Sequence, residues 1–283
     1  MILAKYKYNS FSLIIFLAFT IMATITLFPL FALIMSSFRP GTDLMRFGIT
    51  MDSLLAGGKN LNNYKELFFG ERSLFTSWFK NSLILLFLQT AITVFLTSLV
   101  GYGLAVYKFK GKNIIVGLVL ILMMVPLQIL ILPLYKMMIS MKLMNTLAGV
   151  VIPFILSPVS IFFFRQFCLG LPLALMDAAR IDGVSEYGIF FRIMSHLMLP
   201  AYGAMAILEG LKSWNSYLWP LIVLRTTKQF TIPIGLNTLL TPYGNNYNML
   251  ISGAVIATIP IIILFLLFQK YFISGLSSGS IKG

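Results

Sequence analysis

A chain of 283 residues that is 59% hydrophobic and only 10% charged cannot be an ordinary soluble domain, and its composition predicts a polytopic membrane protein. A formal net charge of +13 would suggest nucleic acid in a soluble chain, but here the Lys and Arg residues stand in short loops between apolar runs, so lipid headgroups are the better partner and nucleic acid is excluded. The single cysteine, Cys168, excludes an intramolecular disulfide framework, and the single histidine, His196, excludes a His-pair metal site.

Apolar runs long enough to cross a bilayer, about 17–25 residues each, occur at 11–36, 80–104, 114–138, 147–167, 200–224 and 249–270. They predict an all-α fold, a polytopic membrane bundle of six transmembrane helices with both chain ends on one side. No small-residue cleavage site follows the first run, so we interpret it as a span and not as a signal peptide. We expect one transmembrane domain over residues 1–283, with its core at about 77–272, a first span and outer loop at 1–76, and a C-terminal tail at 273–283.

The Lys and Arg residues divide evenly between the two sides of the predicted bundle, so their total does not fix its orientation. The tight loop from Lys108 to Lys112 and the basic N-terminus lie on one side, and short loops weigh most in the positive-inside rule. We therefore expect both termini in the cytoplasm.

Prolines fall inside several of the apolar runs, among them Pro126, Pro133, Pro153, Pro158, Pro220 and Pro260. Each removes a backbone hydrogen bond and favours a bend, which a membrane bundle tolerates where neighbours or water satisfy the freed carbonyl. Bent helices can line a path, although prolines are also common in membrane helices without any such role.

Two charged residues stand inside the fifth apolar run, Glu209 and Lys212. Their spacing places them on one helical face, and Asn215, Ser216 and Trp219 follow on or near it. A lone charge at the centre of a bilayer helix costs about 2.5–3.5 kcal/mol, so we expect the pair to neutralise each other and to face the bundle interior. Two interpretations stand equally: the stripe borders a hydrated substrate path, or the charges form a structural ion pair with another helix.

The stretch from Asp177 to Pro200 gathers charged and small residues between apolar runs. Pro172 can begin a helix, Gly183 can end it in a left-handed conformation, and Ser185 can begin a second helix. One side of that second helix is apolar, with Ile189, Phe190, Ile193 and Leu197. The pattern predicts a short helix, a turn and an amphipathic helix, which serve either as a docking surface or as an interfacial connector between spans.

Catalytic motifs are missing from the sequence. It has no G-x-x-x-x-G-K-[ST] phosphate loop, no H-E-x-x-H and no G-x-S-x-G, and one histidine leaves no credible nucleophile–base arrangement. We therefore expect no enzyme, and any ATP that drives transport must be hydrolysed by another chain.

Four motifs carry a family resemblance. They are Asp177-Ala178-Ala179-Arg180-Ile181-Asp182-Gly183 with Phe190, Ile193 and Pro200 behind it; Trp214-Asn215-Ser216-Tyr217-Leu218-Trp219-Pro220-Leu221; Asn63-Tyr64 with Trp78 and Asn81-Ser82; and the ending from Tyr271 to Gly283. With them, most of the chain resembles the inner-membrane permease subunits of bacterial ATP-binding-cassette importers, in the carbohydrate group typified by the second maltose permease subunit. The first motif is similar to the EAA loop of that family.

The resemblance implies a bacterial inner-membrane protein that works with a second, different permease, two ATPase subunits and an external solute-binding protein. ATP and Mg would be bound by the ATPase subunits, so no cofactor is expected in this chain. The EAA loop is the coupling helix of the family and implies ATPase-coupling roles for Asp177, Ala178, Ala179, Arg180, Asp182 and Gly183. In that reading Ala178 and Ala179 allow close approach to the ATPase, Asp177 and Arg180 make polar contacts, and Gly183 sets the turn.

The outer loop from Arg225 to Tyr247 resembles the segment through which such a subunit probes the binding protein, so Tyr243, Asn245, Asn246 and Tyr247 are contact candidates. The resemblance also implies that the tail from Leu276 to Gly283 reaches toward the ATPase, although its glycines and serines alone favour a frayed end.

Three positions depart from the family pattern: Asp177 where Glu is usual, His196 where a proline is common, and the Glu209–Lys212 pair where uncharged residues are expected. The predicted function is one permease half of an ATP-driven importer for a sugar or oligosaccharide. Two alternatives are an ion-coupled secondary carrier for a polar solute, which the charged pair could suggest, and a membrane anchor or sensor without transport.

Overall fold

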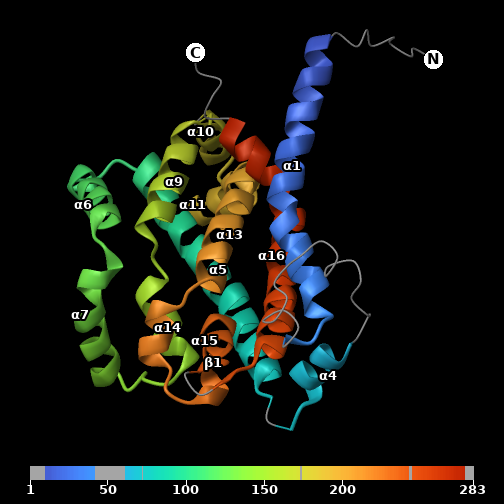
Figure 1. Ribbon diagram of the computed structural model, residues 1–283. Coiled ribbons are helices and arrows are strands. Elements are labelled where there is room, and N and C mark those ends of the chain that lie inside the picture. Colours follow the sequence, from blue (N-terminus) through green and yellow to red (C-terminus); the bar gives the residue numbers. More distant parts are fainter. Residues whose placement is uncertain (1–9, 42–60, 72, 173, 242–243, 278–283) are drawn as a thin grey trace. The chain divides into compact units, whose positions relative to one another are not determined.

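The computed structural model of the protein describes residues 10–41, 61–71, 73–172, 174–241 and 244–277, apart from the side chains of 241, 244–245 and 272–277. The chain divides into two compact units, one made of Met1–Ser73 and Leu236–Ile256 and the other of Leu74–Gly235 and Ala257–Gly283. The units are described separately below, and the elements can be followed by their labels in Figure 1.

The first unit contains the apolar helix α1 (Ser10–Ser37), the short helix α4 (Asn62–Phe69), the strands β1 (Leu240–Thr241) and β2 (Gly244–Asn245), and the start of α16 (Tyr247–Ser277). The strands form an antiparallel hairpin. The amide of Asn63 donates to the carbonyls of Ser37 and Arg39, each at 2.8 Å, and the Tyr64 and Ser37 hydroxyls lie 2.6 Å apart. The Asn63-Tyr64 motif therefore fastens α4 to the end of α1.

The second unit holds most of the helices: α5 (Phe75–Val106), α6 (Lys112–Met124), α7 (Leu127–Ser140), α8 (Leu147–Val151), η1 (Ile152–Phe154), α9 (Pro158–Leu169), α10 (Ala174–Ile181), α11 (Glu186–Gly188), η2 (Ile189–Met194), α12 (Ser195–Leu197), α13 (Leu199–Trp214), α14 (Leu218–Val223), η3 (Thr227–Gln229), most of α15 (Ile232–Asn237) and the end of α16. The all-α fold predicted from the sequence is confirmed.

Helix α5 is the axis of the second unit and packs against α9 and α13 (Figure 1). Gly101 makes the closest part of this packing possible. A Cβ atom at this position would lie 2.6 Å from the Cβ of Phe164 and 2.9 Å from the Ile161 carbonyl oxygen and the Arg165 nitrogen, all on α9. Backbone meets backbone here, so any side chain larger than hydrogen would separate the two helices.

Within the described residues, three helices are long and apolar enough to cross a membrane: Phe11–Ser37, Phe75–Val106 and Tyr247–Tyr271. Three bent pairs pass the same test together, with bends of 104° between α6 and α7, 45° between Leu147–Phe154 and α9, and 75° between Glu186–Leu197 and α13. Counting each pair as one span gives up to six spans. The number predicted from the sequence thus agrees with the structure, but half of the spans are broken.

Prolines mark several of these breaks. Pro126 immediately precedes α7 at the 104° bend, and Pro158 is the first residue of α9 at the 45° bend. Pro133 and Pro260, in contrast, lie inside α7 and α16 without ending either helix. The proline pattern therefore located real bends at some positions and ordinary membrane-helix prolines at others.

The expected fifth span, 200–224, does not form one helix. Helix α13 ends at Trp214, and α14 begins only at Leu218. Pro220 explains the interruption, because a helix continued through this point would bring its ring against the carbonyl of Ser216 and would lack a hydrogen bond there. Glu209 and Lys212 accordingly lie in the last two turns of α13 and not at the middle of a span.

Candidate functional site

The predicted helix–turn–helix is present between α9 and α13. Helix α10 ends at Ile181, and Gly183 has a φ of +75°, the left-handed conformation predicted for it. The amide of Val184 then reaches back to the Ala179 carbonyl at 2.9 Å. The hydroxyl of Ser185 accepts a hydrogen bond from the Gly188 amide at 3.2 Å, so the predicted start of the second helix is also confirmed.

Helix α10 has one buried and one exposed face. Met176 and Ala179 are buried in the chain's own core, whereas Asp177, Ala178 and Ile181 are exposed, Ile181 to 87%. Asp182 and Gly183 are exposed as well. Of the two alanines expected to allow close approach to an ATPase, only Ala178 is therefore on the accessible face, and Ala179 instead lets α10 lie close to its own core.

Three charges of this segment, on Asp177, Arg180 and Glu186, are paired with one another. The guanidinium of Arg180 donates to Glu186 from Nε at 2.7 Å and from Nη2 at 3.2 Å, and to Asp177 from Nη1 at 3.1 Å. The hydroxyl of Tyr107, the residue that follows α5, donates to the second oxygen of Glu186 at 2.7 Å. The contact between Arg180 and Glu186 is bidentate, and arginine–carboxylate ion pairs are strongest in this geometry. It fastens α10 to α11 and, through Tyr107, to the end of α5.

These contacts shift the ionisation of their members. The Arg180 guanidinium, and then the Tyr107 hydroxyl, hold the pKa of Glu186 below its usual value, and Glu186 in turn raises the pKa of Arg180. Burial raises the pKa of Tyr107, and its hydrogen bond to Glu186 adds to the effect. Glu186 is thus ionised and Arg180 charged at neutral pH.

Glu186 and Tyr107 did not emerge from the sequence as site residues. Glu186 is the first residue of α11 directly after the capping Ser185, where an acid favours the helix N-terminus, and this signal could have singled it out. Nothing in the sequence placed Tyr107 beside it, because the two residues are 79 positions apart.

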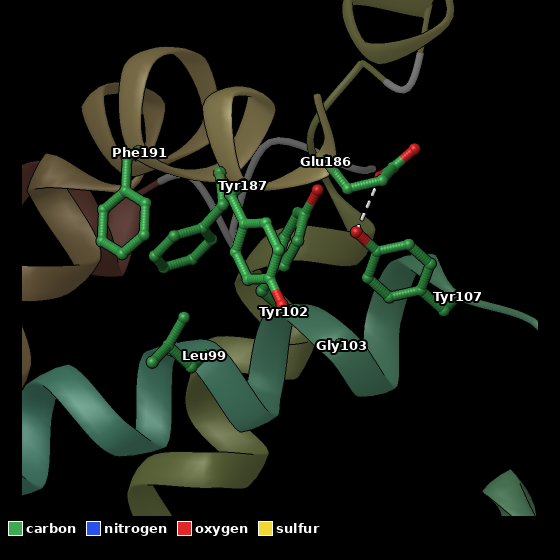
Figure 2. A pocket seen from close by; sticks show the side chains of 8 residues that line it. Leu99, Tyr102, Gly103, Tyr107, Glu186, Tyr187 and Phe191 are labelled. Atoms are coloured by element: carbon green, nitrogen blue, oxygen red, sulfur yellow. Dashed lines mark hydrogen bonds between the residues drawn. The ribbon is translucent and has the colours of Figure 1, made fainter. Parts of the chain in front are cut away.

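Two hollows flank the segment. An apolar pocket of about 370 Å³ lies between the end of α5 and α11–η2 (Figure 2), lined by Leu99, Tyr102, Gly103, Tyr107, Glu186, Tyr187, Phe190 and Phe191. The second, of about 610 Å³, is more polar and is lined by Asp182, Gly183, Val184, Ser185, Tyr187, Gly188, Phe191 and Arg192. The turn after α10 therefore borders a concave surface.

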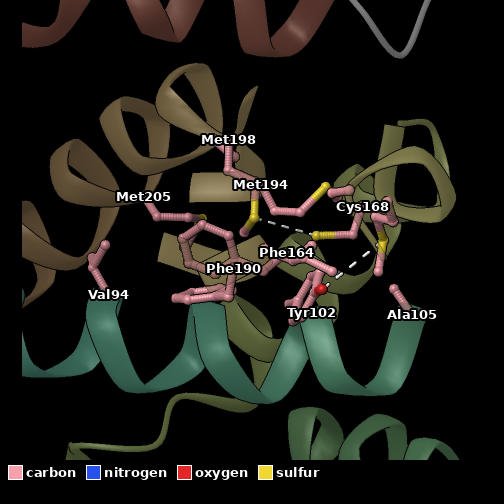
Figure 3. Packing of buried hydrophobic residues seen from close by; sticks show 13 residues of the cluster. Val94, Tyr102, Ala105, Phe164, Cys168, Phe190, Met194, Met198 and Met205 are labelled. Carbon is pink, nitrogen blue, oxygen red and sulfur yellow. Dashed lines mark hydrogen bonds between the residues drawn. The ribbon is translucent and has the colours of Figure 1, made fainter. Parts of the chain in front are cut away.

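The base of the segment is a hydrophobic cluster that includes Tyr102, Phe164, Phe190, Met194 and Met198 (Figure 3). Ile189 and Phe190 are buried as predicted, but Ile193 and Leu197 are only half-buried, and Met194 and Met198 take the core positions. The cause is η2, a π-helix, in which the wider turn shifts the inward face by one residue. His196, in the following helix α12, is exposed.

Glu209 and Lys212 form an unequal pair. The Lys212 ammonium lies 3.5 Å from Glu209 Oε2, but the side chain of Glu209 is 6% exposed and that of Lys212 56% exposed. The other oxygen of Glu209 accepts a 2.6 Å hydrogen bond from Ser160 in the first turn of α9. Glu209 therefore links α13 to α9 through a hydrogen bond, and not through the ion pair with another helix that the structural interpretation expected, whereas Lys212 is exposed.

The continuous polar stripe expected beyond Lys212 is wrong. Because α13 ends at Trp214, Ser216 and Trp219 do not continue its face. Asn215 is exposed and Ser216 half-buried in the break before α14. Trp219 is buried in a separate cluster and donates from its indole nitrogen to the Gly149 carbonyl at 3.2 Å, so it is a packing residue and not part of an open path.

Among the candidates for binding-protein contact, Asn246 has a local role in the first unit. Its side-chain oxygen accepts a hydrogen bond from the Met249 amide at 3.0 Å and so caps α16, which begins at Tyr247. Tyr243 and the side chain of Asn245 lie outside the described residues, as do Gly283 and the rest of the tail from residue 278.

Comparison with known proteins identifies the class to which this fold and segment belong. Residues 94–278 match the family described as "Binding-protein-dependent transport system inner membrane component", and the chain belongs to this family. It is therefore an inner-membrane permease component.

The chain is 53% identical over 277 residues to the arabinooligosaccharides transport system permease protein AraQ of Bacillus subtilis (strain 168). The matched residues cover 98% of this chain and 98% of AraQ. AraQ of Halalkalibacterium halodurans is 53% identical over 270 residues, covering 94% of this chain and 95% of the relative. The lactose transport system permease protein LacG of Rhizobium radiobacter is 35% identical over 204 residues, covering 72% and 74%.

A solved structure supports the fold. A chain from the crystal structure of a bacterial ABC transporter involved in the import of the acidic polysaccharide alginate superposes with a TM-score of 0.78, over 93% of this chain and 96% of that chain, at 18% identity.

Proposed function

We propose that this chain is one permease subunit of an ATP-binding-cassette importer and forms half of the translocation path for an oligosaccharide that contains arabinose. The similarity to AraQ over almost the whole chain carries the proposal. Permeases of lactose and galactooligosaccharides are also among its relatives, so other oligosaccharides are the nearest competing substrates.

In this proposal α10 is the coupling helix. An ATPase subunit takes hold of the exposed face with Ala178, Ile181 and Asp182, and the paired charges around Arg180 and Glu186 fix the angle at which that face is presented. Support comes from the combination of an exposed apolar residue, a small residue beside it and a firm base, which together make a docking shape. Two ATPase subunits hold ATP and Mg, and this chain hydrolyses nothing itself.

The remaining partners are a second, different permease and an external solute-binding protein. We propose that both termini lie in the cytoplasm, that α10 faces the cytoplasm, and that the opposite end of the second unit faces the binding protein. The dense Lys108–Lys112 loop supports this orientation, because it follows α5 on the side of Tyr107 and the coupling segment.

The translocation path, in this proposal, runs past the break between α13 and α14. Irregular backbone at membrane depth is tolerated where it lines a cavity or is covered by protein, and the residues here, from Asn215 to Tyr217, are polar and partly exposed. The exposed Lys212 stands in the last turn of α13, just before this break. Glu209 serves to hold Lys212 and α9 and does not touch the solute.

The test is uptake by proteoliposomes that contain the two permeases and the ATPase, with the binding protein and labelled arabino-oligosaccharide outside. We expect uptake that requires ATP inside and stops when the ATPase subunit is omitted. Uptake driven by an ion gradient without the ATPase would contradict the proposal and favour a secondary carrier. Replacing Lys212 and Asn215 by Leu should reduce uptake with little effect on assembly, whereas unchanged uptake would remove them from the path.

A further inference from the structure

The end of the second unit opposite the coupling segment carries five exposed basic residues. They are Lys80, Lys136, Lys142, Arg225 and Lys228, and we call them the outer basic surface. Helix α5 separates the two ends: Lys80 lies in its second turn, whereas Tyr107 follows its last residue, and a helix of 32 residues is about 48 Å long.

Hydrogen bonds hold together the chain segments that carry the outer basic surface. Asn81, next to Lys80, donates from its side-chain amide to the carbonyls of Lys228 and Phe230, each at 3.0 Å, and the indole of Trp78 donates to the Thr227 carbonyl at 2.8 Å. These bonds place the loop with η3 and Lys228 directly on the start of α5.

The same loop is fixed from its other side by Asn145. Its side-chain oxygen accepts from the Arg225 amide at 2.9 Å and from the amide and hydroxyl of Thr226 at 3.1 and 3.2 Å. The Arg225 guanidinium donates to the hydroxyl of Tyr135, beside Lys136, at 2.8 Å. Lys142, three residues before Asn145, completes the group.

No acid of the second unit balances these charges. Its acidic residues are Asp177, Asp182, Glu186 and Glu209, of which the first three belong to the coupling segment and the last to α13. Among the described residues, none of the five basic side chains lies in an ion pair. The surface is thus strongly positive, and its charges are available to a partner.

Membrane insertion does not account for this surface. The positive-inside rule favours Lys and Arg in cytoplasmic loops, so basic residues on an outward end run against the general preference. A platform fixed by hydrogen bonds from three separate segments also holds its charges at set positions, which suits the fixed surface of a protein better than mobile lipid headgroups.

We propose that the outer basic surface docks an acidic face of the external solute-binding protein, which it attracts and orients by charge. This inference rests on the proposed function, because that function makes this end of the unit the outward one. Opposite charges across such an interface raise the association rate and set the orientation, and their effect weakens as salt screens them.

The test is the affinity of the assembled importer, in bilayer discs of zwitterionic lipid, for its purified solute-binding protein loaded with arabino-oligosaccharide. The variant is the double substitution Lys136→Gln and Lys228→Gln, two exposed side chains that form no hydrogen bond with any residue the structure describes. Lys108→Gln with Lys110→Gln, two exposed lysines at the opposite end of α5, is the matched control.

We expect the variant to bind about three- to tenfold more weakly at low salt, with a smaller dependence of affinity on salt, and to match the unchanged importer near 0.5 M salt, where the screening length falls to roughly 3–5 Å. The control should bind as the unchanged importer does. Equal affinity and equal salt dependence in the variant would overturn the proposal. A loss seen only in discs with anionic lipid would also overturn it and would assign the surface to lipid headgroups.

Uptake separates this inference from the proposed function. If the unchanged importer shows no ATP-driven uptake with its binding protein, the proposed function fails. If uptake is normal and docking is independent of salt and of these lysines, only the docking surface fails.

Discussion

The two ends of α5 use charge in opposite ways. At the coupling end, Asp177 and Glu186 are paired with Arg180 and hold the α10 turn in place. At the outer end, uncharged groups such as the Asn145 and Asn81 amides hold the backbone, and the basic side chains take no part in ion pairs among the described residues.

The difference teaches that charged side chains can serve different purposes at the two ends. Arg180, which the family resemblance assigns to ATPase contact together with Asp177, pairs within the chain with Asp177 and Glu186 and so fixes a loop. Lys228 was not singled out by the sequence, yet its charge is available. The residues that hold each end and those that face outward can therefore be separated by substitution.

The largest effect is expected from a substitution on the buried face of α10, compared with the same substitution on its exposed face. Ala179→Glu places a carboxylate in a core position that is 5% exposed, which costs several kcal/mol, whereas Ala178→Glu, one residue earlier, places it in solvent. We expect Ala179→Glu to prevent recovery of the folded complex on size-exclusion chromatography. The Ala178→Glu variant should fold but no longer bind the ATPase subunit, which would then fail to co-purify with it. Normal assembly of both variants would contradict the assignment of the faces.

Gly183→Val should have the next largest effect at the coupling end. A φ of +75° costs an ordinary residue about 1–2 kcal/mol and a β-branched one more, so the α10 turn should open. The expected readout is ATP hydrolysis that no longer responds to loaded binding protein. Gly117→Ala is the control, since its position in α6 has open space around a Cβ. Normal stimulation in Gly183→Val would show that the turn does not position α10.

At the outer end, Asn145→Ala should lower the melting temperature of the purified permease. It removes three hydrogen bonds to Arg225 and Thr226 and puts Ala at a φ of +59°, a loss of about 2 kcal/mol. Asn145→Asp keeps the accepting oxygen and should melt close to the unchanged protein. If both substitutions lower the melting temperature equally, neutral hydrogen bonding does not hold this end.

The smallest effect should come from Tyr107→Phe, which removes only the hydroxyl that donates to Glu186. Because this contact is exposed, we expect a loss of about 0.5 kcal/mol at pH 7 by thermal unfolding. The pKa of Glu186 is lowered in the folded protein, so its contribution is complete above its unfolded value of about 4.3 and is lost as the pH falls through the lowered value. The difference between Tyr107→Phe and the unchanged protein should therefore shrink toward acid pH.

Much of this fold could be predicted from local sequence signals. Gly183 predicts a turn because glycine readily adopts the left-handed conformation, and Ser185 predicts a helix start because serine is a preferred N-cap. Both predictions are confirmed. The register of η2 could not be predicted, because a helical period of 3.6 residues does not anticipate a π-turn, so Met194 was missed as a core residue.

The site was predicted less completely, because its important contacts join distant parts of the chain. Glu209 and Lys212 were paired correctly by their spacing, but Ser160, which donates a hydrogen bond to the buried Glu209, comes from another helix. The stripe through Trp219 failed because its spacing was continued beyond Trp214, where α13 ends, although Pro220 disfavours a helix that continues through Ser216.

Gly101 has a mechanical consequence. Because α5 and α9 approach backbone to backbone at this glycine, no side chain can separate them there, and their spacing is set by the backbones themselves. Even Gly101→Ala would therefore force the two helices apart at the centre of the second unit.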